Sequence, residues 1–176
     1  MISERVAAAN SEIEDALSKA RDRSIQALVP FVGRELEEGQ VYACFELWWE
    51  QDYSLGYNRF FIKEVDGRQH LETDWGLAGE EGVSFIPEIV AYFDDYYNNM
   101  SKDTELMEDE GIDFSTLLEE SIFKWFSSCW EAAGGEQSKV PTYFCFEKEY
   151  MVRDLKTGEV LSESAAAQKF GYTVEI

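Results

Sequence analysis

The sequence predicts an α+β fold, with an antiparallel sheet of about five strands, helices packed on one face, and the N-terminal helix first. Three observations support this prediction. Apolar side chains recur near the helical period before residue 28, alternate with a period of two from residue 41 to 75, and return to the helical period after residue 84. The chain has 176 residues, 45% of them hydrophobic, so we expect a single domain spanning 1–176.

The first expected element is a helix over residues 3–28. Its apolar stripe is Val6, Ala9, Ile13, Ala16, Leu17, Ala20 and Leu28. Pro30 is expected to break or kink this helix, because proline lacks the N–H that a helix interior needs. A shorter helical piece is then expected up to Glu38, where Gly39 ends it.

Three strands should follow, at residues 41–50, 57–65 and 68–75. In the first, Val41, Ala43, Phe45, Leu47 and Trp49 alternate with Tyr42, Cys44, Glu46, Trp48 and Glu50. Asp66-Gly67 between the second and third strands is a strong signal for a two-residue hairpin turn. The section is therefore predicted to be an antiparallel meander with aromatic residues on both faces.

Two helices are expected next, at residues 84–100 and 113–134. Ser84 is the expected N-cap of the first, with Pro87 in its first turn. Thr116 and Glu119 have the spacing of a capping box for the second. After Pro141, the pattern predicts a strand over 142–153, a turn at 156–158, a return strand at 159–161 and one or two helical turns at 164–170.

The charge of the chain is unevenly distributed. Residues 80–136 hold fifteen acidic residues against two lysines, and so carry thirteen of the 21 net negative charges. Solubility does not require that the charge lie in one part of the chain. Negative charge that is concentrated in one segment usually produces an electrostatic field that steers a basic partner into contact. The negative charge disfavours direct binding of nucleic acid or anionic membranes and favours a cationic protein or a metal cation.

The helices predicted within residues 80–136 use their apolar side chains in the core. The candidate site for partner binding is therefore limited to the end of the first of these helices and the acidic loop that follows it. Tyrosine beside carboxylate suits an interface, because the ring supplies area at low entropic cost and the acids select lysine or arginine. The predicted partner-binding residues are Asp94, Asp95, Tyr96, Asn99, Asp103, Glu105, Glu108, Asp109, Glu110 and Asp113.

Metal binding and catalysis receive less support. The loop 103–113 offers oxygen ligands for Ca²⁺ or Mg²⁺, but its spacing departs from the EF-hand because position 5 is Met107 and position 6 is not glycine. A zinc site cannot be written, since His70 is the one histidine and the cysteines are scattered. No nucleophile–base motif or phosphate loop occurs. We therefore predict a non-enzymatic protein without metal or cofactor.

The expected location is the cytoplasm. No apolar run reaches the roughly 20 residues that span a bilayer, and the N-terminus lacks the features of a signal peptide. Cys44, Cys129 and Cys145 all lie in aromatic surroundings and have no paired spacing, which predicts buried free thiols in a reducing compartment.

Three segments carry a resemblance to a known class of proteins: Tyr42–Glu50 (YACFELWWE), Tyr92–Asn99 and Tyr143–Glu149 (YFCFEKE). Small, acidic α+β chains with such Trp- and Tyr-rich strands resemble the immunity proteins that bacteria carry against toxins of polymorphic and contact-dependent systems. The resemblance implies tight binding to a cognate toxin. A nuclease would be the natural match, because its nucleic-acid cleft is basic.

Two alternative functions are compatible with the same charge. The first is a DNA mimic that occupies the DNA site of a restriction or repair enzyme, which would require carboxylates spaced like phosphates. The second is a Ca²⁺- or Mg²⁺-binding protein, for which the loop 103–113 would be the site.

Overall fold

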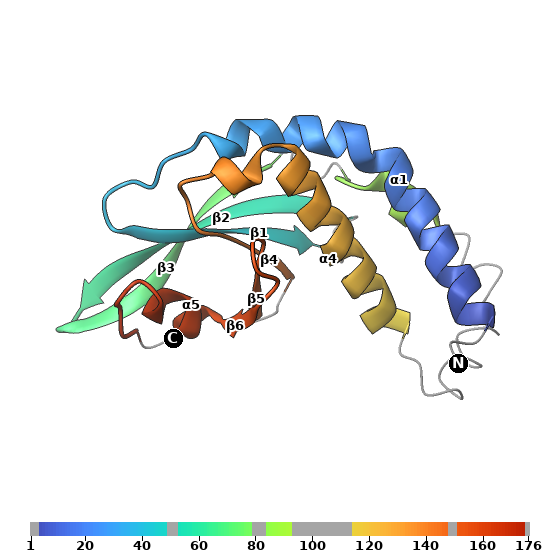
Figure 1. The fold of residues 1–176 in the computed structure, drawn as a ribbon. Coiled ribbons are helices and arrows are strands. Elements are labelled where there is room, and N and C mark those ends of the chain that lie inside the picture. Colours follow the sequence, from blue (N-terminus) through green and yellow to red (C-terminus); the bar gives the residue numbers. More distant parts are fainter. Residues whose placement is uncertain (1–3, 49–52, 79–83, 93–113, 148–150, 175–176) are drawn as a thin grey trace.

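The computed structural model describes residues 4–48, 53–78, 84–92, 114–147 and 151–174. Six strands form one mixed sheet in the order β3-β2-β1-β4-β5-β6. Helices α1 and α4 lie side by side over one face of this sheet, and α5 lies over the other (Figure 1). The α+β class and the leading helix are as predicted. The prediction that helices cover one face only is wrong, because α5 packs on the second face.

The first helix is longer than its sequence suggests. α1 spans Glu4–Val32 and buries Ile13, Leu17 and Leu28 against the sheet. The prediction that Pro30 breaks the helix is wrong. Pro30 is exposed in the last turn, where proline removes one hydrogen bond to a carbonyl that water can reach. The predicted helical piece up to Glu38 is also absent, since residues 34–37 are not helical.

The predicted meander is present. β1 (Gln40–Trp48) pairs antiparallel with β2 (Ser54–Val65), and β2 pairs antiparallel with β3 (Arg68–Leu77). Asp66 and Gly67 have φ values of 52° and 75°, as a two-residue hairpin turn with left-handed residues requires. Both positions therefore confirm the hairpin prediction.

The C-terminal strands correct the predicted sheet. β4 (Thr142–Phe146) pairs with β1 in parallel, so the sheet is mixed and has six strands, whereas an antiparallel sheet of about five was expected. The strand predicted over 142–153 is two strands, because Glu147 lies in a turn and β5 (Met151–Asp154) pairs back on β4. β6 (Val160–Ser162) is the outer strand, and α5 (Glu163–Gln168) follows directly.

The two helices predicted at residues 84–100 and 113–134 differ from the prediction in how they begin. A helix is present at residues 87–92, with Pro87 in its first turn as predicted. Ser84 is not its N-cap, because the Ser84 hydroxyl makes no hydrogen bond and the Ile89 N–H bonds to the Ile86 carbonyl. α4 spans Phe114–Ala132 and a 3-10 turn, η2, follows at Gly135–Gln137. Thr116 thus lies inside α4, which rules out the predicted capping box.

Aromatic rings fill the layer between the helices and the sheet. Phe45 of β1 lies at the centre, with ring centroids 5.4 Å from Phe31, 5.0 Å from Tyr57, 5.3 Å from Phe126 and 5.4 Å from Trp130. Burying one such ring stabilises a fold by about 1.5–3 kcal/mol. This layer makes the helical face of the sheet a closed core that is not accessible to a partner.

The opposite face of the sheet is only partly covered. Ala166 and Ala167 of α5 are buried in a second cluster with Tyr42, Cys44 and Tyr143. The C-terminal residues Tyr172 and Val174 belong to the same cluster and pack near Phe60. The part of this face nearest the end of β1 receives no cover from the elements that the structure describes. No helix among the described residues is long and apolar enough to cross a membrane.

Candidate functional site

The predicted acidic site lies outside the described residues. This applies to all ten of its members: Asp94, Asp95, Tyr96, Asn99, Asp103, Glu105, Glu108, Asp109, Glu110 and Asp113. The described chain stops at Tyr92 and resumes at Phe114, and both ends belong to helices. The site prediction therefore stays a prediction.

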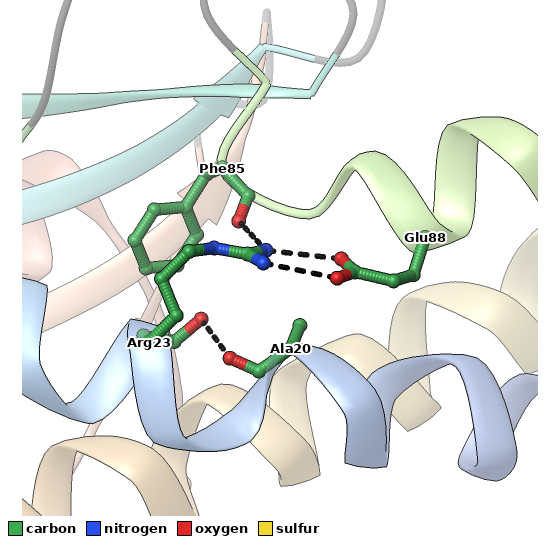
Figure 2. A network of polar contacts seen from close by, with 5 residues as sticks. Ala20, Arg23, Phe85 and Glu88 are labelled. Carbon is green, nitrogen blue, oxygen red and sulfur yellow. Dashed lines mark hydrogen bonds and ion pairs between the residues drawn. The ribbon is translucent and has the colours of Figure 1, made fainter.

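An ion pair fixes the helix that leads into this acidic segment. Arg23 of α1 binds both carboxylate oxygens of Glu88 at 2.9 Å and the Phe85 carbonyl at 3.1 Å (Figure 2). The hydrogen bond to the Arg23 guanidinium lowers the pKa of Glu88 below its ordinary value. One fork-shaped side chain thus joins α1 to the 84–92 segment at two points.

The described residues show a second candidate on the uncovered part of the sheet. We define the acidic–aromatic face by the residues that alternate onto this side of β1, β2 and β3, together with the residue that follows β4 and the first residue of α5: Glu46, Trp48, Gly56, Asn58, Trp75, Glu147 and Glu163. Strand register and one backbone hydrogen bond place several of these residues next to one another. Asn58 pairs with Trp75, Glu46 pairs with Gly56, and the Glu147 N–H bonds to the Leu47 carbonyl beside Trp48.

Two indole rings form the apolar part of this face. Trp48 and Trp75 have ring centroids 5.9 Å apart with an interplanar angle of 52°. Trp75 is 59% exposed, the largest value among the large apolar side chains of the described residues. Gly56 makes room for Trp48, because a Cβ at this position would lie 3.0 Å from Trp48 Cζ2. The lack of a side chain at Gly56 therefore allows the Trp48 ring to pack at this position.

Carboxylate and amide groups form its polar part. Asn58 is 3% exposed, and its Nδ2 donates a hydrogen bond of 2.7 Å to Glu46 Oε2. This bond fixes the amide orientation, since a carboxylate oxygen can only accept. Asn58 Oδ1 and Glu147 Oε2 are then left buried without a partner. Each unpaired buried acceptor costs about 1–3 kcal/mol, so these two atoms make the polar part of the face unfavourable for the stability of the chain.

The surroundings of Glu163 on this face disfavour its charged form. Burial raises the pKa of Glu163 above its ordinary value, and the negative charge of Glu46 raises it further. Glu46, Glu147 and Glu163 make no ion pair within the described part of the chain. A cation bound at this face would relieve the repulsion between these carboxylates.

Beneath α5 the same face continues as a buried patch. The thiols of Cys44 and Cys145 are 3.4 Å apart, and burial raises the pKa of Cys44 well above its ordinary value. All three cysteines are free and buried, as the sequence predicted. The contact between Cys44 and Cys145 was not predicted, because it depends on the parallel pairing of β1 with β4.

Sequence reasoning did not include the acidic–aromatic face among its site residues. One part of the face could have been predicted from the alternation of residues in β1. Glu46 and Trp48 lie on the opposite side of this strand from the buried Phe45 and Leu47. Asn58, Glu147 and Glu163 come from three other elements and have no common motif. Their proximity follows from strand order, which the sequence does not display.

Other features of the described residues define no alternative site. No group of three or more His, Cys, Asp or Glu in the described ranges could hold a metal ion. A hollow of about 500 Å³ lies between α4 and the β5–β6 turn, and its polar lining mixes Lys124 and Lys156 with Glu131 and Glu136. This mixture shows no preference for one sign of charge.

Comparison of the chain with protein-family models, with curated proteins and with solved structures gave no significant match.

Proposed function

We propose that this chain is a non-enzymatic binding protein that captures a cationic protein partner. The observation that carries the proposal is the acidic–aromatic face. It combines three carboxylates that make no ion pair with another described residue, a buried amide with an unpaired oxygen and an exposed tryptophan. An exposed aromatic beside desolvated acids is typical of an interface and costs free energy in a chain that binds nothing.

The net charge of −21 supports the same proposal at longer range. A charge of this size accelerates encounter with a basic protein and suppresses contact with acidic ones. We assign the two acidic regions different roles. The acidic–aromatic face provides the short-range contacts, and the segment from Asp94 to Asp113 adds charge that steers the partner.

The particular function that we propose is neutralisation of a toxin, as in the bacterial immunity proteins that this sequence resembles. Such a protein needs no catalytic group, and it works by covering the active site or substrate surface of its partner. A nuclease fits best, because a cleft that binds nucleic acid presents the arginine and lysine side chains that this acidic surface would attract.

The test is co-expression with the product of the neighbouring gene, scored as survival of the host cell, together with calorimetry on the purified pair. We expect protection and a complex whose affinity falls as salt rises. The variant Trp75→Ala with Glu46→Gln should speed dissociation. Reversing charge at Asp95, Glu108, Asp109 and Asp113 should instead slow association and flatten the salt dependence.

A matched control separates these effects from a general loss of charge. Four exposed acids that belong to neither region can be changed to lysine: Glu12, Glu14, Asp22 and Glu38. This variant should protect cells and bind almost as the unaltered chain does. If the unaltered chain neither protects cells nor binds the neighbouring product at low salt, the proposed function is wrong.

A further inference from the structure

We infer that the outer edge of β3 is an interaction surface for a second copy of this chain, with the two β3 strands antiparallel and Leu71 of one copy opposite Leu71 of the other. The inference goes beyond the proposed function, because it concerns an edge of the sheet and a partner identical to the chain itself. It is carried by the backbone of β3 and by the order of charges along this strand.

The two edges of the sheet differ in length and in regularity. β6, at one edge, has three residues, and α5 follows it directly. β3, at the other edge, has ten residues and contains no proline, and the β2–β3 hairpin projects beyond the other strands (Figure 1). Its register with β2 has no bulge, and no described strand pairs with its outer side. Proteins usually shorten, bend or cover an edge strand to prevent pairing with another chain, so a long and regular edge is a candidate for such pairing.

The backbone groups that point outward from β3 can be assigned to individual residues. The Ala78 N–H donates to the Leu55 carbonyl at 3.1 Å, in the same register as the β2–β3 pairs. Antiparallel strands exchange hydrogen bonds at every second residue, so the even-numbered residues of β3 bond to β2. The N–H and C=O groups of Gln69, Leu71 and Thr73 therefore point outward. A second strand would pair with these groups and leave the hydrogen bonds between β2 and β3 intact.

The charges of β3 are ordered so that the strand complements itself. Arg68 lies at its start, and Glu72 and Asp74 lie toward its end. When two copies run antiparallel about a two-fold axis at Leu71, Arg68 of each copy lies opposite Asp74 of the other. His70 of each copy then lies opposite Glu72. Charges usually prevent an edge from pairing, but opposite charges in cross-strand pairs attract, so this order of charges favours a second copy in one register.

Other registers of the same pair are less favourable. Moving the axis by one residue toward the C-terminus sets Glu72 opposite Glu72, and moving it by two sets Glu72 opposite Asp74. Moving it toward the N-terminus shortens the overlap of the two strands. The axis at Leu71 also places Gln69 opposite Thr73, so residues whose backbone groups point outward face each other and can exchange hydrogen bonds.

The arrangement has a consequence for the rest of the sheet. Its two-fold axis is perpendicular to the sheet, so both copies present the same face on the same side. One continuous sheet would then carry two acidic–aromatic faces. The net charge of −21 on each copy opposes association. At an ionic strength of about 0.15 M the Debye length is roughly 8 Å, so repulsion between distant charges is largely screened while the paired charges of β3 remain in contact.

The first test is sedimentation equilibrium of the full chain at about 0.15 M NaCl, from micromolar to millimolar concentration. We expect a reversible equilibrium between monomer and dimer. Amide hydrogen exchange, followed by NMR on the ¹⁵N-labelled chain, should show that the N–H groups of Leu71 and Thr73 become protected as concentration rises. The N–H groups of His70 and Glu72 should be protected at every concentration, because they bond to β2.

Exchange of charges tests the register. Arg68→Glu places like charges opposite each other, and so does Asp74→Arg. Each variant should dimerise roughly tenfold more weakly, because the two-fold axis repeats the repulsive pair. An equal mixture of the two variants should recover the affinity of the unaltered chain to within roughly threefold, because the mixed dimer restores both pairs of opposite charge. The matched control is Lys156→Glu, at an exposed position in the β5–β6 turn, which changes the net charge as Arg68→Glu does and should leave dimerisation unchanged.

Thr73→Pro gives a test that does not depend on charge. Proline at this position removes an outward N–H and no hydrogen bond to β2, which edge strands tolerate. The variant should keep the circular dichroism spectrum of the unaltered chain and remain monomeric. Asp74 also pairs with Arg59 inside the chain, so the same spectrum checks that Asp74→Arg folds.

A chain that is monomeric at every concentration would overturn the inference, and so would a dimer that Thr73→Pro and both charge variants leave unchanged. Failure of the folded charge variants to recover a dimer on mixing would overturn the register at Leu71. Protection of the Leu71 and Thr73 N–H groups only in the presence of the neighbouring gene's product would assign this edge to a strand of that partner, and would likewise contradict pairing with a second copy.

Discussion

At the scale of single residues, burial and the charge of the nearest partner together decide the pKa of an ionisable group. Glu88 and Glu163 are both glutamates, and their pKa values move in opposite directions. Glu88 is held by the Arg23 guanidinium, which favours the carboxylate. Glu163 has no such partner among the described residues, and burial together with the charge of Glu46 favours the neutral acid. A carboxyl group with a raised pKa is a candidate for a functional site, which is consistent with the place of Glu163 in the acidic–aromatic face.

The raised pKa of Glu163 predicts a pH-dependent stability. Between the ordinary glutamate pKa of about 4.3 and the higher folded value, the folded state binds more protons than the unfolded state, so stability falls as pH rises through this window. Glu163→Gln should therefore be more stable than the unaltered chain at pH 7, and this advantage should vanish below the ordinary pKa. Urea unfolding at several pH values measures the difference.

The control for this prediction is Glu64→Gln, at an exposed position near the β2–β3 hairpin. It should change stability little at either pH. An advantage of Glu163→Gln that persists undiminished at low pH would show that the substitution acts through packing and not through charge.

At the scale of elements, local backbone chemistry explains the hairpin and the helix ends. Gly67 has φ of 75° in the β2–β3 turn, where an L side chain is strained whatever the space around it. Pro30 is tolerated in α1 because it lies in the last turn and faces solvent. Ser84 is a good N-cap by composition, but the 87–92 helix begins too late for its side chain to act. The effect of Pro30 and of Ser84 on these helices therefore depends more on the distance of each residue from the helix end than on its residue type.

The hairpin supplies a prediction with an internal control. A Cβ added at Gly67 or at Gly33 would meet nothing within 4 Å, and of the two only Gly67 has a positive φ. Gly67→Ala should lower the free energy of unfolding by about 1–2 kcal/mol, from the strain of the left-handed conformation. Gly33→Ala should be neutral or slightly stabilising. Equal losses at the two glycines, measured by urea unfolding, would contradict the role of backbone conformation.

At the scale of the whole molecule, charge and topology act separately. The sheet order brings β4 between β1 and β5, which joins the meander β1–β3 and the C-terminal strands β4–β6 into one sheet (Figure 1). The helical layer then closes one face, and α5 closes part of the other. The surplus of negative charge contributes nothing to this packing. It opposes it through self-repulsion, because like charges are brought closer on folding.

Screening should therefore stabilise the fold. Raising NaCl from about 0.01 M to about 0.1 M shortens the Debye length from roughly 30 Å to roughly 10 Å. We expect the melting temperature to rise by roughly a few degrees as self-repulsion is screened. The variant with lysine at positions 12, 14, 22 and 38 has four charges reversed and should show a smaller rise. A melting temperature that falls with salt would mean that exposed ion pairs outweigh the repulsion.

The sequence by itself determined what depends on near neighbours. The period of apolar residues located α1, α4 and the meander, and Asp66-Gly67 located the hairpin. These features could be predicted because helix faces, strand alternation and turn geometry depend on residues a few positions apart.

The tertiary structure alone decided the order of strands and therefore the candidate site. β4 could have joined either edge of the meander, and long-range packing of Phe144 against Phe126 accompanies its parallel pairing with β1. That choice sets Glu147 beside Trp48 and α5 beside Glu46. Contacts between residues a hundred positions apart reflect the packing of the whole core, which no local pattern encodes.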